Sequence, residues 1–362
     1  MANVGEMDFN RLLTDSLGIF FKNALRVSIS DPAQAFFFTK TIRWQRKAAK
    51  LRSQWEEKGF HVPPILVFSI TSRCNLSCQG CYHRTLRGTT KAEIGVEKVK
   101  EILAEAKELG ISFVVFGGGE PLMRKEIIAL TEGYPEMLFM VFTNGLLIDS
   151  EFMGRMRRQR NLIPFLSMEG YQDSTDGRRG TGVYGRLQRV ISALEKENLF
   201  WGTSLTVTRA NFESVTNRSF VGDLVRSGCR IFFFVEYTPV KEGTEGWVIT
   251  PEQRSSMVKI RDSLRSKFPA WFIMLPGDEE EIGGCLSAGK GFVHISAEGD
   301  VEPCPFVPYS DMNLSDVTLR EALQSKFLKS IRESSKELHE TEGGCALWAR
   351  RAWLQSLTKV QD

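Results

Sequence analysis

The sequence predicts an α/β fold with a parallel sheet, an N-terminal helical extension and a small C-terminal domain. Apolar runs alternate with helical stretches from about residue 64 to residue 267. The runs are almost continuously apolar, as strands are when helices cover the faces of a parallel sheet. Residues 1–62 lack this alternation, and residues 276–362 contain a hairpin-like pattern instead. We therefore expect three parts, with bounds at 1–62, 63–275 and 276–362.

The N-terminal part is expected to contain two helices. Apolar residues recur at helical spacing from about 9 to 27, and Asp31-Pro32 then provides a cap and a first-turn proline for a helix over about 33–55. This second helix carries three consecutive phenylalanines from Phe36 and no acidic residue before Glu56. Its basic residues are Lys40, Arg43, Arg46, Lys47, Lys50 and Arg52. The part either packs on the main domain or lies on an anionic membrane surface.

The central part is expected to contain six strand–helix units. The strands are placed near 65–70, 113–116, 138–142, 162–167, 202–207 and 231–235. The helices are placed near 94–109, 124–132, 150–159, 183–198 and 213–227. In the C-terminal part, 291–295 and 301–304 flank a turn, and a helix follows over about 318–338. Sites in parallel α/β folds lie at the carboxyl ends of the strands, so functional residues are expected there.

Composition narrows the class of protein. The chain has 362 residues, 42% apolar and 25% charged, with a net charge of +3, which is too small to argue for nucleic acid. No apolar run is long enough to span a bilayer, and the polar first residues do not read as a secretory signal. Seven cysteines, an odd number with three in one loop, do not read as a disulfide framework. A reducing cytoplasm is therefore the expected compartment.

The strongest local signal follows the first strand of the central part. Cys74, Cys78 and Cys81 form a C-x3-C-x2-C pattern in a polar loop that contains glycine. Thiolates at this spacing can converge on one metal core, and soft sulfur ligands suit iron–sulfur clusters or zinc. Three cysteines could also be half of a zinc site or buried thiols, but zinc needs a fourth ligand that is not near in the sequence. In a cubane, three thiolates leave one iron without a protein ligand.

Further motifs end the later strands. Gly117-Gly118-Gly119-Glu120-Pro121 follows the second strand, and Thr143-Asn144 ends the third. Together with the cysteine loop, these motifs resemble the radical S-adenosylmethionine (SAM) superfamily. The resemblance implies a partial (β/α)6 barrel, a [4Fe–4S] cluster on Cys74, Cys78 and Cys81, and SAM bound at the open iron. It also implies that glycine backbone and the Glu120 carboxylate hold the amino group of SAM.

The resemblance extends to other proposed SAM contacts. Ser167, at the end of the fourth strand, matches a serine that relatives place near the ribose or amino-acid part. Glu169 stands where relatives often have aspartate, so its role differs. A loop over 176–180 is expected to supply Arg178 or Arg179 to the SAM carboxylate, and Tyr82 is expected to line the adenine side. The implied SAM-binding set is Tyr82, Gly118, Gly119, Glu120, Pro121, Thr143, Asn144, Ser167, Arg178 and Arg179.

Three more cysteines lie in the C-terminal part. Cys285, Cys304 and Cys345 each fall in a turn flanked by glycine or proline. This resembles the short "twitch" or SPASM-like extension of the superfamily, which implies one auxiliary [4Fe–4S] cluster. Its fourth ligand would be substrate, solvent or a side chain such as His294. Three unrelated thiols are the alternative, and Cys229 fits neither set.

The resemblance implies the mechanism but leaves the substrate open. A low-potential donor of the ferredoxin or flavodoxin type would reduce the first cluster, and SAM would be cleaved to a 5′-deoxyadenosyl radical that abstracts hydrogen from a substrate. Glu236 and Tyr237, after the sixth strand, are expected to act on the substrate or relay a proton, or else to form a structural pair. The basic, aromatic N-terminus favours a lipid or membrane-associated substrate. Peptide or tetrapyrrole substrates, and a non-catalytic electron carrier, are the alternatives.

Overall fold

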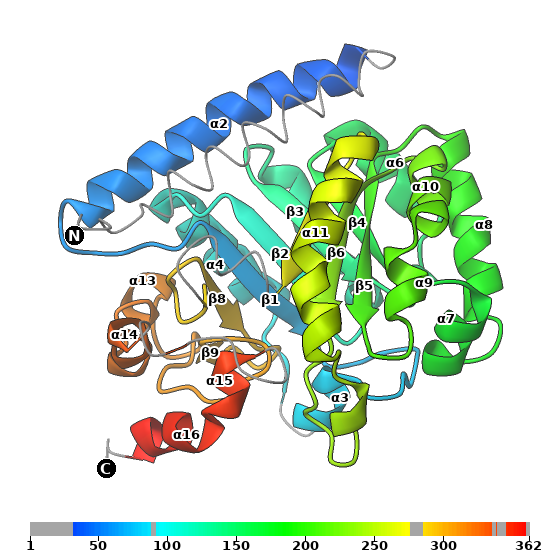
Figure 1. Ribbon diagram of the computed structural model, residues 1–362. Coiled ribbons are helices and arrows are strands. Elements are labelled where there is room, and N and C mark those ends of the chain that lie inside the picture. The colour runs from blue at the N-terminus through cyan, green and yellow to red at the C-terminus, as the bar shows by residue number, and fades with distance from the viewer. Residues whose placement is uncertain (1–31, 88–91, 276–284, 335–337, 339–344, 360–362) are drawn as a thin grey trace, which may run out of the picture.

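The computed structural model describes residues 32–87, 92–275, 285–334, 338 and 345–359. Its centre is a nine-stranded sheet in the order β7-β6-β5-β4-β3-β2-β1-β8-β9, open at both edges (Figure 1). Neighbours from β7 to β8 are parallel, and β9 is antiparallel to β8. The strands are β1 Ile65–Thr71, β2 Phe113–Gly118, β3 Leu138–Thr143, β4 Leu162–Met168, β5 Trp201–Val207, β6 Cys229–Glu236, β7 Trp271–Leu275, β8 Phe292–Ile295 and β9 Val301–Glu302.

All six predicted strands of the central part are present, and the predicted open parallel α/β class is confirmed. The predicted hairpin is also present, as the β8–β9 pair. Its first strand pairs in parallel with β1, from Ile65 opposite Phe292 to Phe68 opposite Ile295. The C-terminal hairpin therefore continues the main sheet on the side next to the cysteine loop.

Helices cover the outer face of the sheet. The longer ones are α4 Val96–Leu109, α6 Ser150–Gln159, α8 Val183–Lys196 and α11 Pro251–Lys267. The shorter ones are α3 Tyr82–Leu86, η2 Pro121–Met123, α5 Lys125–Leu130, η3 Thr131–Gly133, α7 Gln172–Arg179, α9 Phe212–Thr216, α10 Arg218–Arg226, η4 Glu245–Trp247, α13 Leu319–Ala322, α14 Lys326–Glu333, α15 Ala346–Ala349 and α16 Arg351–Lys359. Within the described residues, no helix is long and apolar enough to cross a membrane.

Three predicted helices are each divided in two. The one expected over 213–227 is α9 and α10, because the Asn217 side chain accepts a hydrogen bond from Ser219 N and starts a new helix. The one over 124–132 is α5 with η3. The one over 318–338 is α13 and α14, with Ser325 capping the second. The elements α7, α11 and β7 were not predicted as such.

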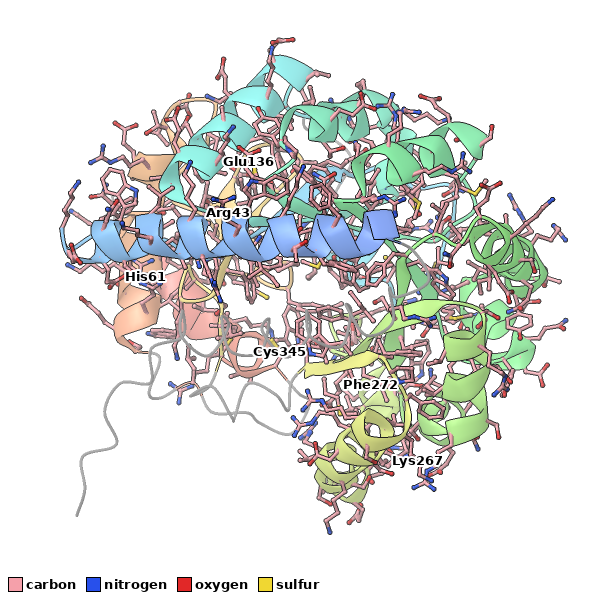
Figure 2. The ribbon with its side chains drawn as sticks, turned by 90° about the horizontal axis from the view of Figure 1, so that it is seen from above. Arg43, His61, Glu136, Lys267, Phe272 and Cys345 are labelled. Atoms are coloured by element: carbon pink, nitrogen blue, oxygen red, sulfur yellow. The ribbon has the colours of Figure 1, made fainter. Side chains whose placement is uncertain are left out.

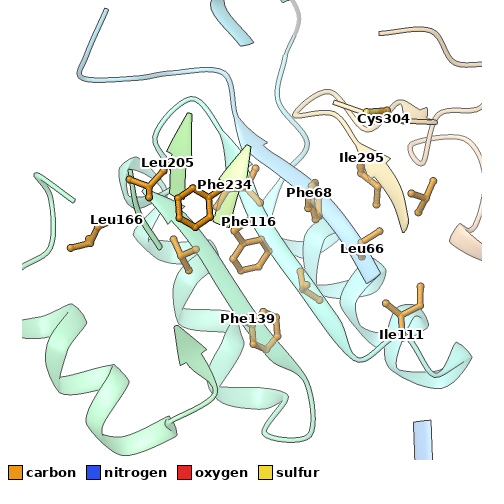
Figure 3. Close-up of a cluster of buried hydrophobic side chains, with 14 of the residues drawn as sticks. Leu66, Phe68, Ile111, Phe116, Phe139, Leu166, Leu205, Phe234, Ile295 and Cys304 are labelled. Carbon is orange, nitrogen blue, oxygen red and sulfur yellow. The ribbon is translucent and has the colours of Figure 1, made fainter. Parts of the chain in front are cut away.

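Two apolar clusters occupy the two faces of the sheet. On the outer face, Phe68, Phe116 and Phe139 pack against the covering helices, as the close-up shows (Figure 3). Successive side chains of a strand point to opposite faces of the sheet. The strand residues that point the other way, including Phe113 and Phe165, form a second cluster on the inner face. Both clusters are almost fully buried, which explains why these strands are nearly continuous apolar runs.

Helix α2, Pro32–Glu56, closes the inner face at the amino ends of the strands (Figures 1 and 2). Phe37 and Phe38 enter the inner apolar cluster. Arg52 Nη1 donates to Gly110 O at 2.6 Å, just before β2. The predicted second helix is thus confirmed, and two of its three phenylalanines face the sheet. The helix predicted over about 9–27 lies outside the described residues.

Candidate functional site

The cysteine loop after β1 is held by contacts to three separate parts of the chain. Gln79 N donates to Arg178 O at 2.9 Å, and the Asn75 side chain accepts from Asn144 Nδ2 at 2.7 Å. At the start of the loop, Ser72 N donates to the Glu93 carboxylate at 2.8 Å. Most of these contacts come from the carboxyl-end edge of the sheet. The loop is therefore positioned by the tertiary structure and not by its own sequence alone.

The three thiols of this loop are unbridged and close enough to act on one another. Cys74 is exposed, and Cys78 and Cys81 are half-buried. Burial raises the pKa of Cys74, and the nearby charges of Glu120, Cys78 and Cys81 raise it further. Within the described ranges, no three Cys, His, Asp or Glu side chains lie as close as the ligands of a single metal ion. A cubane places different demands on its ligands, because each thiolate binds a different iron.

The glycines after β2 allow a close backbone crossing with the cysteine loop. Gly119 N donates to Thr71 O at 2.7 Å, and Glu120 N donates to Arg73 O at 2.8 Å. A Cβ on Gly119 would lie 2.0 Å from Arg73 O, so any side chain there would collide with backbone. Gly118 has φ +107°, in the region that favours glycine. The two motifs that are about forty residues apart in the sequence thus form one unit.

We expect Gly119→Ala to disrupt this unit while Gly117→Ala leaves it intact. The alanine at 119 would overlap the Arg73 carbonyl and push the cysteine loop away, whereas a Cβ on Gly117 meets no atom within 4 Å. Overpacking of this kind costs about 1–3 kcal/mol of stability. Affinity for SAM should fall at least about tenfold in Gly119→Ala, measured by equilibrium dialysis on reconstituted protein. Equal affinities of the two variants would contradict the crossing's proposed role.

The Glu120 carboxylate is buried and oriented by the next strand end. It is 1% exposed and accepts hydrogen bonds from Thr143 Oγ1 at 2.7 Å and from Asn144 N at 2.8 Å. Leu122 N adds a third bond at 3.0 Å, in the short helix that Pro121 starts. Burial raises the pKa of Glu120, and these three hydrogen bonds oppose the increase. The structure therefore brings the predicted residues of β2 and β3 together, with one carboxylate oxygen still able to accept further bonds.

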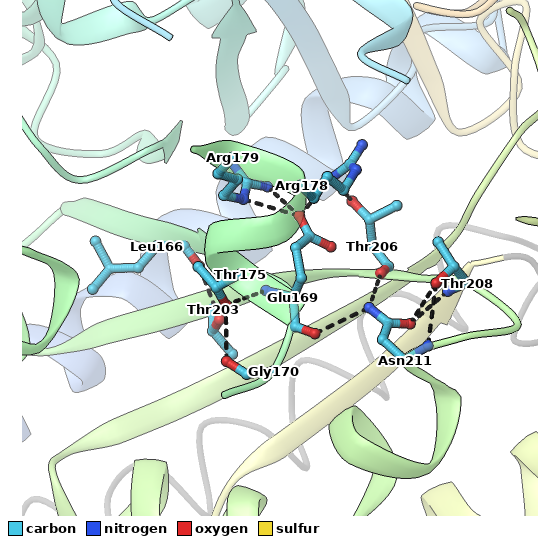
Figure 4. Close-up of polar contacts among 10 residues, drawn as sticks. All are labelled: Leu166, Glu169, Gly170, Thr175, Arg178, Arg179, Thr203, Thr206, Thr208 and Asn211. Carbon is cyan, nitrogen blue, oxygen red and sulfur yellow. Dashed lines mark hydrogen bonds and ion pairs between the residues drawn. The ribbon is translucent and has the colours of Figure 1, made fainter. Parts of the chain in front are cut away.

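A charged cluster lies at the ends of β4 and β5 (Figure 4). Glu169 Oε1 accepts from Arg178 Nη1 at 2.5 Å and from Arg179 Nη2 at 2.6 Å. Glu169 Oε2 is buried and has no hydrogen-bond partner among the described residues. Arg178 and Arg179 lie in the last turn of α7, so the prediction of a loop over 176–180 is wrong, because 172–179 is helical. Ser167 is half-buried on β4 beside this cluster.

Tyr82 directly follows the cysteine loop, and Tyr237 contacts it at Gly80. The Tyr82 ring packs on Phe306 with centroids 4.8 Å apart, so it contacts the C-terminal part. The Tyr237 hydroxyl lies 3.0 Å from Thr244 Oγ1, and a Cβ on Gly80 would be 2.6 Å from that hydroxyl. Glu236 is buried and ion-paired with Arg254. Each side chain named here already has a partner within the chain.

The C-terminal cysteines are also unbridged and lie near the β8–β9 hairpin. Cys304 is buried, and Ala288 N donates to Pro303 O at 2.9 Å, which ties the turn after Cys285 to the Cys304 segment. Cys345 Sγ accepts from Trp348 N at the start of α15. Cys229 is buried on β6, away from both sets, and burial raises the pKa of its thiol. The Cys229 thiol is thus part of the apolar core.

Sequence reasoning missed a buried polar chain that joins the two cysteine regions. Arg87, just after α3, forms a two-pronged ion pair with Glu302 of β9. Glu302 Oε2, which also accepts from Arg87 Nη2, accepts from His294 Nδ1 at 2.7 Å, and His294 Nε2 accepts from Ser69 Oγ at 2.8 Å. Both ring nitrogens of His294 are therefore occupied, so His294 does not have a free nitrogen for a cluster. Residues 215 positions apart carry no local signal that would reveal such a pair.

A lone histidine after the cysteine loop predicts a surface residue, but His83 is buried in this same region. Its side chain is 3% exposed, and neither ring nitrogen has a hydrogen-bond partner among the described residues. Burial, together with the charges of Arg87 and His294, lowers the pKa of His83 to about 3.

The structure combines an open parallel sheet with a three-cysteine loop and a glycine–glutamate turn at its carboxyl edge, an arrangement that suits an iron–sulfur α/β enzyme. The family model described as "Radical SAM superfamily" matches residues 68–215, from β1 to α9. Residues 68–215 are therefore similar to the radical SAM superfamily, whose enzymes use a [4Fe–4S] cluster and SAM.

Individual relatives cover most of the chain. It is 23% identical over 319 residues to the AdoMet-dependent heme synthase of Methanosarcina barkeri, covering 79% of this chain and 88% of that protein. It is 25% identical over 305 residues to the mycofactocin maturase MftC of Mycobacterium tuberculosis, covering 80% and 76%. Streptococcus suis SuiB bound to its precursor peptide shares the fold with a TM-score of 0.63 at 17% identity, over 86% of this chain and 75% of SuiB. The AdoMet-bound structure titled anSMEcpe shares it with a TM-score of 0.61 at 17% identity, over 82% and 97%.

Proposed function

We propose that Cys74, Cys78 and Cys81 hold the SAM-binding [4Fe–4S] cluster of a hydrogen-abstracting enzyme. The observation that carries this is the backbone crossing of the cysteine loop with Gly118–Pro121. Three unbridged thiols and a turn with no room for a side chain at Gly118 or Gly119 fit a cluster with a bound amino acid. When bound and reduced by a low-potential ferredoxin or flavodoxin, the cluster supplies reductive cleavage of SAM to methionine and a 5′-deoxyadenosyl radical.

The chain's own residues would bind and orient SAM. The Gly118–Pro121 turn would accept the amino group, with Thr143 and Asn144 fixing the Glu120 carboxylate beside it. Arg178 and Arg179 lie near the carboxyl end of β4 and both donate to Glu169. A guanidinium has several N–H donors, so either arginine would bind the SAM carboxylate while it still contacts Glu169. Ser167 would contact the ribose or amino-acid part, and Tyr82 the adenine side.

Glu236 and Tyr237 would act from the carboxyl end of β6, at the same edge of the sheet as the cysteine loop. Tyr237 supports the cysteine loop at Gly80, so its hydroxyl lies on the cluster side of the strand end. Glu236, held by Arg254, adds a buried ion pair at the substrate side. Both would orient the substrate and exclude water around the radical.

We propose that Cys285, Cys304 and Cys345 hold an auxiliary [4Fe–4S] cluster. The support is that each thiol is unbridged and that the turn after Cys285 is hydrogen-bonded to the Cys304 segment. This part lies beside β1 through β8, next to the first cysteine loop (Figure 1). An auxiliary cluster there could accept an electron from a product radical.

Anaerobic reconstitution tests both cluster proposals. We expect about eight irons per chain, and 5′-deoxyadenosine after reduction with dithionite and addition of SAM. A content of about four irons per chain, with 5′-deoxyadenosine still formed, would refute the auxiliary cluster but not the first cluster. Absence of 5′-deoxyadenosine from iron-replete protein would favour the non-catalytic electron carrier.

The substrate class is proposed from the relatives and from α2. The heme synthase and the mycofactocin maturase both match this chain over about four fifths of its length, which favours a tetrapyrrole or a peptide as substrate. A lipid or membrane-associated substrate is favoured by the surface of α2, and it would place a cytoplasmic enzyme on a membrane face. Incubation with members of each class under SAM turnover separates them, since consumption of the true substrate should accompany 5′-deoxyadenosine formation.

The exposed face of α2 supports docking on an anionic membrane. Phe36 is 61% exposed, and Lys40 Nζ lies 4.4 Å from the centre of its ring. Four other basic residues share the exposed side of the helix, namely Arg43, Arg46, Lys47 and Lys50. A stripe of exposed basic residues with one aromatic matches what an anionic lipid surface attracts.

We expect Arg43→Glu/Lys47→Glu to weaken binding to phosphatidylserine vesicles at least about tenfold, since each basic residue contributes about 1 kcal/mol there. The matched control is Lys259→Glu/Lys267→Glu, which reverses two exposed charges on α11. Co-sedimentation measures both. Equal pelleting of the two variants would remove the membrane proposal. Charge reversal is preferable to deleting residues 1–62, because deletion would uncover the inner apolar cluster that Phe37 and Phe38 fill.

A further inference from the structure

Among the described histidines, His83 is the one whose ring nitrogens have no hydrogen-bond partner within the described residues. His61 contacts Glu56 and Lys290 O through its two nitrogens, and His294 is held between Glu302 and Ser69. Both nitrogens of His83 are buried and lack a hydrogen-bond partner among the residues that the structure describes. An unsatisfied buried polar group costs about 1–3 kcal/mol, so a native structure normally supplies a partner. A metal centre is one such partner, because imidazole is a common ligand of iron.

The helix that carries His83 docks on the segment around Cys304. Arg87 directly follows α3 as its C-cap residue, in an extended backbone conformation. Arg87 binds the Glu302 carboxylate and reaches Pro305 O, and Tyr82 packs on Phe306. Cys304 lies between these contact points. His83 is thus buried on α3, between residues that contact the segment on either side of Cys304.

We propose that His83 is the fourth protein ligand of the auxiliary cluster, with Cys285, Cys304 and Cys345. This inference rests on the proposed function, which places a cluster on those three cysteines. A cubane held by four protein ligands has no open iron for substrate. The auxiliary cluster would then exchange electrons rather than anchor the substrate, and its imidazole ligand would raise its reduction potential, as histidine ligation does in other clusters. The ligand would come from the helix that follows the first cysteine loop, which links the two centres through the chain itself.

Pulsed electron paramagnetic resonance of reduced protein tests this directly. The sample is the Cys74→Ala/Cys78→Ala/Cys81→Ala variant, which retains only the auxiliary cluster, prepared without SAM so that no SAM nitrogen contributes. Protein grown with ¹⁴N-histidine should show a strongly coupled nitrogen, and protein grown with ¹⁵N-histidine should show the coupling change to that of ¹⁵N. This readout needs neither activity nor a change at His83.

Variants then assign the coupling to one histidine. In this background we expect His83→Gln to lose the nitrogen signal and to lower the cluster's reduction potential. His61→Gln is the matched control and should keep the signal, because His61 is bonded elsewhere. A signal that persists in His83→Gln, or that disappears instead in His339→Gln, would overturn the assignment. Eight irons in the unsubstituted protein without any histidine coupling would refute the ligand alone, whereas four irons would refute the auxiliary cluster and the ligand together.

Discussion

Cys78→Ala is expected to abolish 5′-deoxyadenosine formation and to lower the iron content by about four per chain. The cysteine loop offers three thiolates for three of the four irons of the first cluster, and removal of one leaves too few ligands to retain it. The rate should fall at least about a thousandfold, the scale on which removal of an essential member of a catalytic unit acts. Iron analysis and product quantification under dithionite measure the two effects.

Cys229→Ala is the control for Cys78→Ala. Cys229 is a fully buried thiol on β6 and belongs to neither cysteine set. Its removal should cost about 1 kcal/mol of stability while leaving iron and product formation near those of the unsubstituted protein. If Cys78→Ala retained full iron and activity, the assignment of the first cluster would be wrong.

The second large effect is expected at the Arg87–Glu302 ion pair. Both side chains are nearly fully buried, and Glu302 is also bound by His294. Arg87→Ala would leave a buried carboxylate without its main counter-charge, which costs about 3–5 kcal/mol. Chemical unfolding of the reconstituted protein should show this loss. Because Cys304 lies two residues after Glu302, the variant should also lose auxiliary iron before it loses the iron of the first cluster.

Lys125→Ala is the matched control for this pair. Lys125 and Asp149 form an ion pair at 2.5 Å, but both side chains are about half exposed. Water screens such pairs, so the loss should stay below about 1 kcal/mol. Similar losses for Arg87→Ala and Lys125→Ala would show that the buried pair does not hold the C-terminal segment against α3.

Local pattern was sufficient for much of the fold. Strands such as β1 and β4 are apolar along their whole length, and a covered parallel strand tolerates little else, so their positions could be predicted. The α6 bounds were predicted as found, because Asp149 caps its first turn. The α7 segment was misread, since Asp176-Gly177 suggests a turn while the fold holds it as helix.

The candidate site was predicted in part. Each motif could be placed at a strand end, because parallel strands bring their carboxyl ends to one edge. Their contacts could not be predicted. That Arg178 and Arg179 share one oxygen of Glu169, or that His294 is already occupied, depends on side chains from separate elements meeting in space.

The sequence by itself determined which thiols lie close together along the chain, where the glycine turn falls, and which segments are strands. Those features depend on neighbours within a few residues, and local spacing encodes them. Only the tertiary structure decided which face of α2 meets the sheet, how the C-terminal hairpin joins β1, and which buried histidine is left without a partner. Those outcomes depend on packing and desolvation between residues that are far apart in the sequence, such as 215 positions for Arg87 and Glu302 and 225 for Ser69 and His294. No local pattern records such contacts.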